Sequence, residues 1–269
     1  MEQSQISLLN SHGVAALRQG NLPSAANLFR RALEGTKMQS ELVDTSMTQA
    51  NKLNQATGTR ILLPFSQEVG LPKSLSKGSP MGSPDDSLEQ QSGMYIHSQG
   101  ILFADDNLVS TSTDPLVRLS IGAAIIIYNL AVVEQVRGLQ FASMPRQGRE
   151  EQECTSQEVY TQRARSLYST SRNLLLEACF DLRQASGIPL IDFLIMATSN
   201  NAGYAAFVQG DYTSAQDHFE HVEGFTSLLR SPSLFQLWDA ETLLIMDHYA
   251  SDFLLNTLVL RPPSIAAAA

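Results

Sequence analysis

The residues best suited to chemistry lie in the stretch HFEHVE, where two histidines and two glutamates fall within six positions. His218 and His221 are three residues apart, beside Glu220 and Glu223, and this spacing places them on one face of a helix. Such a cluster could hold a metal ion. The alternative is that both histidines flank Phe219 on the outward side of a helix, without the open ligand geometry that a catalytic metal site needs. We favour this surface interpretation and predict no metal and no cofactor.

Other reactive residues form no recognisable catalytic set. Asp85 and Asp86 are adjacent, as are Asp105 and Asp106, but neighbouring carboxylates do not converge on one site, and both pairs fall in predicted loops. The sequence contains no G-x-S-x-G elbow, no phosphate-cradling glycine loop and no H-E-x-x-H motif. We therefore predict that the protein is not an enzyme. The alternative from another class is an all-helical enzyme whose site no motif reveals.

Two Ser-Pro pairs, which begin at Ser79 and Ser83, resemble proline-directed phosphorylation sites. Residues 64–92 around them gather Ser, Pro, Gly and Lys with few apolar residues, a composition typical of a disordered linker. Regulation by phosphorylation is one hypothesis for these pairs. The other is that Ser-Pro pairs are common in any low-complexity linker.

The charge of the chain argues against some classes of partner. Its 269 residues include 27 acids and 18 bases, which gives a formal charge of −9. Residues 186–260 contain nine acids and a single base, Arg230. Because phosphate binding requires clustered Lys and Arg, we predict no nucleic-acid partner and no membrane partner. A small-molecule ligand is not expected either.

Three features bear on the compartment. The first residues, MEQSQISLLN, show no basic segment followed by an apolar one, so we expect no secretory signal. The longest apolar stretch, residues 121–133, is shorter than the ~20 residues that a bilayer-spanning helix needs. Cys154 and Cys179 make neither a disulfide framework nor a metal quartet, so we expect reduced thiols. These features predict a cytoplasmic or nuclear protein.

Hydrophobic periodicity predicts an all-α chain. Residues 6–34 are expected to form two helices joined at Gly20, with Asn21 capping the second helix. Another helix is expected to begin at Pro115, and its nearly continuous apolar circumference indicates burial on most sides. Residues 93–106, in which two apolar triplets flank HSQG, are expected to form a short extended or hairpin segment. Further helices are predicted at residues 159–185, 190–209, 212–229, 235–249 and 252–260.

One pattern of small and aromatic residues occurs near both ends of the chain, with successive offsets of 7, 5, 4 and 3 residues. The two sets are Gly13, Gly20, Ala25, Phe29, Ala32 and Gly203, Gly210, Ala215, Phe219, Val222. A weaker middle copy consists of Ala131, Gly138, Ala164, Tyr168 and Ser171, with an insertion after its glycine. The first member of each set lets two helices approach closely, and the aromatic member fills the space beside their crossing. The glycines at the second place can adopt the positive φ that ends a helix.

This pattern resembles the tetratricopeptide repeat, a helix-turn-helix unit of about 34 residues. The resemblance covers roughly half of the chain. It departs from the family in lacking a closing proline and in having long insertions between units. The resemblance implies antiparallel helical hairpins in a compact α-solenoid. The predicted organisation is a first hairpin at residues 1–34, a low-complexity disordered insertion at 35–92, a helical repeat region at 93–261 and a tail at 262–269.

In this family the first helices of the repeats line a concave groove that captures extended peptides or partner helices. The register of this chain then implies a groove lined by Asn10, Val14, Tyr128, Asn129, Val132, Asn200, Tyr204 and Phe207. Some members clamp the acidic carboxyl terminus of chaperones with two Lys, two Asn and an Arg. Here only Asn129 matches that clamp, while Asn10, Val14, Ala197 and Asn201 occupy its other places. We therefore predict a protein or peptide partner other than a chaperone tail.

The run AAIIIYNLAVV is apolar on the groove face as well as on the core face, so an open groove would expose a large hydrophobic patch. We expect the segment MYIHSQGILF, residues 94–103, to cover it from within the chain. In one hypothesis a partner displaces this segment from the groove. In the other the segment is a permanent part of the core. The predicted function is a noncatalytic protein-interaction module, an adaptor or complex subunit with an apolar groove.

Overall fold

The computed structural model describes residues 3–57, 97–102, 115–143, 152–181, 189–229 and 239–260. All regular elements in these ranges are helices, so the predicted all-α class is confirmed for the described part of the chain. The helices are α1 (Gln3–Arg18), α2 (Leu22–Thr57), α6 (Pro115–Ser143), α7 (Gln152–Asp181), α8 (Pro189–Val208), α9 (Tyr212–Leu229) and α10 (Ala240–Leu260). The two acidic pairs and the two Ser-Pro pairs lie outside the described residues.

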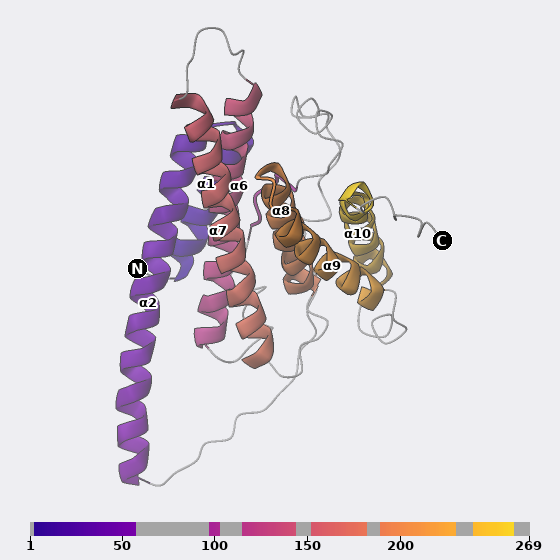
Figure 1. Ribbon diagram of the computed structural model, residues 1–269. Coiled ribbons are helices and arrows are strands. Elements are labelled where there is room, and N and C mark those ends of the chain that lie inside the picture. The colour runs from indigo at the N-terminus through magenta and orange to yellow at the C-terminus, as the bar shows by residue number, and fades with distance from the viewer. Residues whose placement is uncertain are drawn as a thin grey trace.

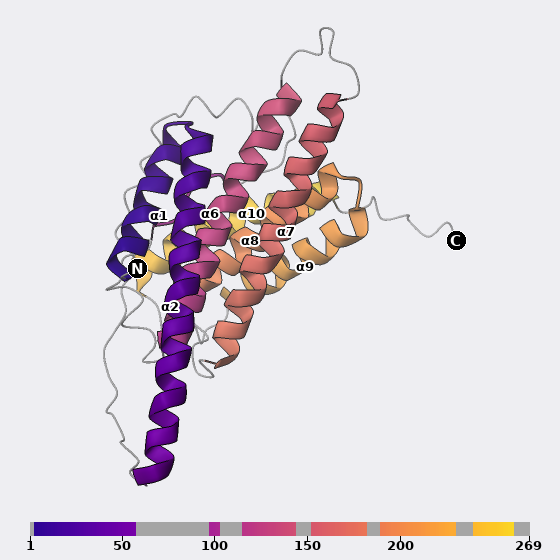
Figure 2. The same cartoon turned by 90° about the vertical axis from the view of Figure 1, so that its left-hand side faces the viewer.

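Each helix packs mainly against its neighbours in the sequence, in the order α1, α2, α6, α7, α8, α9, α10. Figure 1 shows α2 at one side, α6 and α7 next to it, then α8 and α9, and α10 at the other side. The turned view places α8, α9 and α10 behind α6 and α7 (Figure 2). The far end of α2 projects beyond the other helices in both views. The helix α2 runs without a break through Gly35 to Thr57, so the first part of the stretch expected as a disordered insertion, residues 35–57, is helical.

The turns α1/α2 and α8/α9 are built alike. Gly20 and Gly210 have φ angles of +71° and +76°, which confirms the positive φ expected at these two glycines. In the first turn the N–H of Asn21 donates to the carbonyl of Ala16 at 2.9 Å. The N–H of Asp211 donates to the carbonyl of Ala206 at 3.0 Å in the second. These six-to-one bonds are typical of a Schellman motif, in which a left-handed glycine ends the helix.

Polar side chains cap the helices that follow these turns. Asn21 Oδ1 accepts the N–H of Ser24 at 3.2 Å, as expected from the sequence, and Asp211 Oδ1 accepts the N–H of Ser214 at 3.1 Å. The bond to Ser214, together with the guanidinium of Arg165, holds the pKa of Asp211 at about 2. Both second helices therefore begin with satisfied first-turn donors.

Close contact between a glycine and a phenyl ring holds each of these hairpins together. A Cβ atom at Gly13 would lie only 2.5 Å from Cε1 of Phe29. A Cβ atom at Gly203 would lie 2.8 Å from Cζ of Phe219. Both rings are buried, so any larger side chain at either glycine must push a ring out of the core. The predicted approach of helices at these two pairs is confirmed.

The middle set differs from the prediction at Gly138. This glycine does not end a helix with positive φ, because α6 continues through it to Ser143. A Cβ atom there would lie 3.2 Å from Oγ1 of Thr161, so the glycine instead lets α6 pass close to α7. Beyond it, Phe141 stacks on Tyr160 with ring centroids 5.4 Å apart, and this contact supports the extra helical turn.

Three further boundaries differ from the expected ones. The helix α7 begins at Gln152, seven residues before the expected start at Val159. Residues 240–260 form one helix instead of two, since Ala250, at the expected break, is fully buried in the core. The described part of the expected hairpin, residues 97–102, contains no strand.

The helix α6 occupies the centre of the core, as its apolar circumference predicts. Ile121, Ala124, Ile125 and Ile126 are completely buried. Within the part of the chain that the structure describes, α6 alone is long and apolar enough to cross a membrane by length and composition. Most of that apolar window, 78%, is buried inside the fold.

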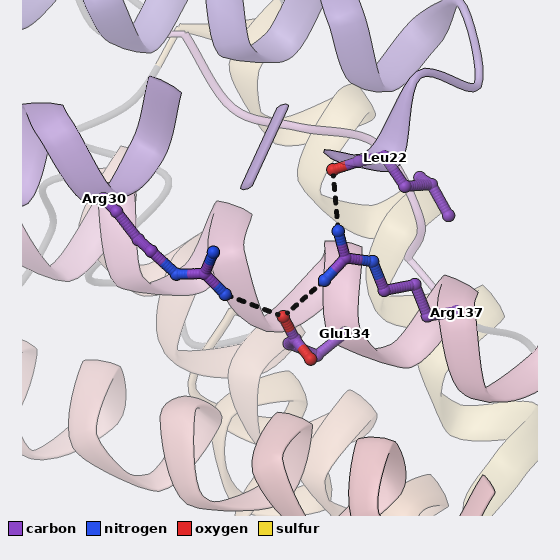
Figure 3. A network of polar contacts seen from close by, with 4 residues as sticks. All are labelled: Leu22, Arg30, Glu134 and Arg137. Atoms are coloured by element: carbon purple, nitrogen blue, oxygen red, sulfur yellow. Dashed lines mark hydrogen bonds and ion pairs between the residues drawn. The ribbon is translucent and has the colours of Figure 1, made fainter. Parts of the chain in front are cut away.

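A buried carboxylate joins α6 to α2. Oε1 of Glu134 accepts from Arg137 at 3.0 Å and from Arg30 at 3.5 Å, and Arg137 also donates to the carbonyl of Leu22 at 3.2 Å. Figure 3 shows Glu134 between the two guanidinium groups. The Glu134 side chain is 3% exposed, against 55% for Arg30 and 19% for Arg137. A charge buried to this extent depends on its partners.

Candidate peptide groove

Residues 97–102 lie against the first helices of the successive helix pairs. His97 and Ile101 are buried, Ser98 and Leu102 are half-buried and Gln99 is exposed. Gly100 rests on α1, where an added Cβ atom would lie 3.0 Å from Val14 Cγ2 and 3.2 Å from Leu17 Cδ2. The described part of this segment thus packs on α1 and α6.

The main chain of Ile101 is held by two asparagines. Its N–H donates to Asn129 Oδ1 at 2.7 Å, and its carbonyl oxygen accepts from Asn129 Nδ2 at 2.8 Å. The same carbonyl accepts from Asn10 Nδ2 at 3.0 Å. Asn129 Nδ2 also donates to Asn10 Oδ1 at 2.8 Å, which orients both amides. Both polar groups of the Ile101 peptide units are thus satisfied by side chains.

The main chain of His97 is held in the same way. Its N–H donates to Asn201 Oδ1 at 3.1 Å, and its carbonyl oxygen accepts from Asn201 Nδ2 at 2.9 Å. The second bond to this carbonyl comes from the hydroxyl of Tyr128 at 3.0 Å. Asn201 therefore has the role at His97 that Asn129 has at Ile101, and Tyr128 has the role of Asn10.

We call each such pair of side chains a main-chain clip. In the repeat register Asn129 and Asn201 both stand two residues before the small residue of their set, Ala131 or Gly203. Asn10 and Tyr128 both stand three residues before Gly13 or Ala131. Each clip thus has two members. One stands three residues before the small residue of its first helix, and the other stands two residues before the small residue of the next first helix. The two clipped residues of the segment are four positions apart.

The imidazole of His97 sits among aromatic rings of α6, α8 and α10. Its centroid lies 5.0 Å from that of Phe193, 5.6 Å from Tyr249 and 6.4 Å from Phe253. Burial lowers the pKa of His97 to about 4, so the ring is neutral at pH 7. Nδ1 lies 2.6 Å from the oxygen of Tyr128, whose one hydroxyl hydrogen serves the His97 carbonyl. When the Tyr128 hydroxyl donates to this carbonyl, the proton of the neutral ring belongs on Nδ1, which then donates to the Tyr128 oxygen.

A second layer of polar groups supports the clip at His97. Asn201 Nδ2 donates to the hydroxyl of Tyr168 at 3.1 Å, and Tyr168 donates to Gln135 Oε1. Burial raises the pKa of Tyr168, so its hydroxyl stays protonated and can serve as both donor and acceptor. On the other side, Asn200 Nδ2 donates to Asn201 Oδ1 at 3.1 Å. The Asn201 amide is therefore oriented from both sides by residues outside the segment, Tyr168 and Asn200.

The eight residues predicted to line the groove fall into three groups. Asn10, Val14, Tyr128 and Asn129 contact the segment directly, through the bonds above or beside Gly100. Asn200 stands next to the clip residue Asn201, and Val132 is fully buried core. Tyr204 and Phe207 instead belong to a separate apolar cluster with Ala215 and Phe219.

Sequence reasoning did not place Asn201 or Asn256 in the groove. Asn201 was considered only as a mismatch to the chaperone clamp, although it shares its register place with Asn129. That shared place was the signal that could have identified it. Asn256 of α10 donates from Nδ2 to Asn200 Oδ1 at 2.6 Å, and no repeat register had been assigned to α10.

The two histidines of α9 lie in different surroundings. His221 is exposed, and its Nδ1 lies 2.6 Å from the carbonyl of Asp217. His218 is half-buried, and desolvation together with Arg172 and Arg165 lowers its pKa to about 4. Within the described ranges, no three His, Cys, Asp or Glu residues come together in a way that could hold a metal ion.

Comparisons with protein-family models, with curated proteins and with solved structures find no match for this chain. Amides and phenols in these positions bind peptide main chains and carry no nucleophile or titrating general base at pH 7.

Proposed function

We propose that the protein is a noncatalytic interaction module, an adaptor or complex subunit, whose groove takes up a non-helical segment of a partner protein. The observation that supports this most is the pair of clips at His97 and Ile101. They bind N–H and C=O groups, which every non-proline residue has. A groove that holds its occupant through the main chain can therefore accept a segment of another protein in the same place.

We further propose that the helices form a tetratricopeptide-like α-solenoid. Three features support this arrangement: the matched left-handed turns at Gly20 and Gly210, the matched glycine–phenyl contacts, and the recurrence of clip residues at equal register places. Successive first helices then present their clips side by side along one groove.

The side chains of residues 97–102 indicate which partner segments would fit. The first clipped position lies in an aromatic surround, where a neutral ring is favoured. The position of Gly100 faces Val14 and Leu17 so closely that it favours glycine. The second clipped position buries an aliphatic side chain, Ile101. The groove thus favours a ring, a half-buried residue, an exposed residue, glycine and an aliphatic residue in that order.

In this chain the groove is filled from within, so a partner must compete with residues 97–102. An intramolecular segment can have an effective concentration on the order of 1 mM. For a partner peptide with an intrinsic Kd of about 1 µM and an equally good internal segment, the apparent affinity would fall roughly 1,000-fold. A partner would then need a second contact elsewhere, or a condition that weakens the internal segment.

The test uses the full chain with Ile101→Asp, because a buried unpaired carboxylate disfavours the internal segment. A fluorescent peptide with the sequence of residues 94–103 should bind this variant at least ~100-fold more tightly than the unaltered chain. Adding Asn129→Ala should abolish binding, while Asn27→Ala, on the exposed face of α2, should not change it. If a folded Ile101→Asp chain binds no peptide, residues 97–102 are permanent core and the proposal is wrong.

A further inference from the structure

His97 carries the one side chain in residues 97–102 that takes up a proton under mildly acidic conditions. The residue is 3% exposed, and its ring meets the rings of Phe193 and Tyr249 edge to face. Both main-chain groups of His97 are bound by Asn201 at the same time. Because the main chain is fixed, the imidazole cannot turn out into solvent unless the segment leaves the groove.

The groups that face this ring do not offset a positive charge. From α6 the hydroxyl of Tyr128 lies 2.6 Å from Nδ1, and from α10 the ring of Tyr249 lies against the imidazole. Asp252 of α10 acts on Tyr249 and pairs with the exposed His248 at 3.8 Å. None of the described carboxylates contributes to the shift in the pKa of His97, which burial lowers to about 4. A proton on the bound ring would therefore be a buried charge without a counter-charge.

The clip at this place does not depend on the side chain that it holds. Asn201 and Tyr128 bind the N–H and the carbonyl of His97, which any residue except proline also offers. A phenylalanine would make the same main-chain bonds and place a ring among the same aromatic neighbours. Its ring takes up no proton. The internal segment and a partner segment with phenylalanine would thus respond differently to acid.

We propose that a proton on His97 releases residues 97–102 from the groove, so that mild acid opens both clips to a partner segment with phenylalanine at the His97 place. This inference rests on the proposed function of the groove. The partner is a non-helical protein segment with phenylalanine, two further residues, glycine and an aliphatic residue in that order. Acid is the condition that weakens the internal segment without weakening such a partner.

The pKa of His97 sets the size of the effect. This pKa is about 4 in the groove and has its ordinary value of about 6.5 in a released segment. Between pH 8 and pH 5 the binding of the internal segment should therefore weaken ~30-fold. A peptide that does not titrate gains this factor in apparent affinity, because its competitor is weaker. A peptide with histidine gains nothing, since its own binding weakens equally.

The experiment measures the apparent Kd of three acetylated fluorescent peptides for the unaltered full chain at pH 8 and at pH 5. All have the sequence of residues 97–102, with histidine, pyrazolylalanine or phenylalanine at the first position. Pyrazole is a five-membered ring that keeps an N–H and stays neutral at pH 5, so it matches imidazole in size. The pyrazole and phenylalanine peptides should bind ~30-fold more tightly at pH 5, and the histidine peptide should not change. A gain with pyrazole but not with phenylalanine would overturn the named partner.

His97→Gln in the full chain is the matched protein control. Its internal segment does not titrate, so the pyrazole peptide should lose its gain and the histidine peptide should bind ~30-fold more weakly at pH 5. A gain that persists in this variant would overturn the proposal. Equal gains for the histidine and pyrazole peptides on the unaltered chain would also overturn it, because another group such as His218 would then drive the release.

Failure of the groove itself gives a different result. If no peptide binds a folded Ile101→Asp chain at pH 8, the proposed function fails. If the peptides bind that chain, but their apparent affinity for the unaltered chain is the same at both pH values, acid release is wrong while the groove stands.

Far-ultraviolet circular dichroism at each pH checks that the chain keeps its helices. If helix content falls at pH 5, the comparison moves to pH 5.5, where the expected gain is ~10-fold. Loss of helix at pH 5.5 as well would overturn the proposal, because acid would then unfold the chain instead of releasing one segment.

Discussion

The side-chain amide of Asn201 binds both main-chain groups of His97, with 3.1 Å from the His97 N–H to Oδ1 and 2.9 Å from Nδ2 to the His97 carbonyl oxygen. An asparagine that pairs with one residue in this way replaces the partner strand of a β-ladder. It can therefore hold a non-helical segment in a protein that has no strand among its described residues. Asn129 makes the same pair of bonds to Ile101.

Removing either asparagine should destabilise the protein. Asn201→Ala and Asn129→Ala each leave a buried N–H and a buried carbonyl with fewer partners, which should cost about 2–4 kcal/mol in the free energy of unfolding. Asn27→Ala is the matched control, and at an exposed site its effect should stay within about 0.5 kcal/mol. Urea denaturation with a constant m-value measures all three. Values near zero for both buried asparagines would show that the clips contribute no stability.

The contact between Gly203 and Phe219 predicts an effect opposite to helix propensity. Alanine favours a helix over glycine by about 1 kcal/mol, yet Gly203→Ala should destabilise by about 1–3 kcal/mol because its Cβ would overlap the phenyl ring. Gly224→Ala, in α9 with nothing within 4 Å of the added Cβ, should instead stabilise by about 0.5–1 kcal/mol.

A double-mutant cycle tests whether that contact is the cause. In a Phe219→Leu background the cost of Gly203→Ala should fall by at least about 1 kcal/mol, since the ring is gone. Phe219→Ala alone should cost about 3–5 kcal/mol as a core truncation. Thermal or urea unfolding would measure both. Additive effects of the two substitutions would contradict the proposed packing.

His97 makes stability depend on pH. Its pKa is lowered to about 4 in the folded protein, so between about pH 6.5 and 4 the unfolded chain binds a proton that the folded chain does not. Stability is therefore full above pH 6.5 and falls with pH through this window, by up to about 3 kcal/mol from this residue.

Substitution of His97 measures its contribution to the pH dependence of the free energy of unfolding. His218 also has a pKa lowered to about 4, so it contributes in the same direction and window. His97→Gln should make the fall in unfolding free energy between pH 6.5 and 4 clearly smaller, and His218→Gln in addition should reduce it further. An unchanged fall in His97→Gln would show that this imidazole is not held neutral in the groove.

The buried carboxylate of Glu134 should contribute more to the free energy of unfolding than its exposed partner Arg30. Glu134→Gln keeps the size of the side chain but leaves Arg137 without its counter-charge, and we expect a loss of about 2–4 kcal/mol. Arg30→Ala should cost less than about 1 kcal/mol, because this partner is 55% exposed and its nitrogen is 3.5 Å from Oε1. Equal losses from the two substitutions would contradict this view of the network.

The local geometry of the two terminal hairpins could be predicted from the sequence. Gly13 allows close approach to the ring of Phe29 and Gly20 takes the left-handed turn, as their places in the pattern predict, and the set at Gly203 repeats this arrangement. The same logic failed at Gly138, because glycine serves close helix approach as well as left-handed turns. Only the neighbouring contact of Phe141 with Tyr160 decided between these roles, and that contact depends on the tertiary fold.

The groove was only partly predictable, for a different reason. A register can indicate which residues face a groove, and it did so for Asn10, Tyr128 and Asn129. It cannot indicate which main-chain groups those amides bind, because the partner residues are about 30 to 100 positions away in the sequence. The same register also predicted Tyr204 and Phe207 at the groove, but these two residues pack in a separate cluster with Phe219.

Amide hydrogen exchange of the unaltered chain tests most directly whether residues 97–102 are held through their main chain. The N–H groups of His97 and Ile101 donate to buried asparagines, whereas Gln99 is exposed between them. We predict that the first two exchange at least ~100-fold more slowly than the N–H of Gln99, and that Asn201→Ala speeds exchange at His97 more than at Ile101. Equal exchange at the rate of an unstructured peptide across the segment would contradict the account.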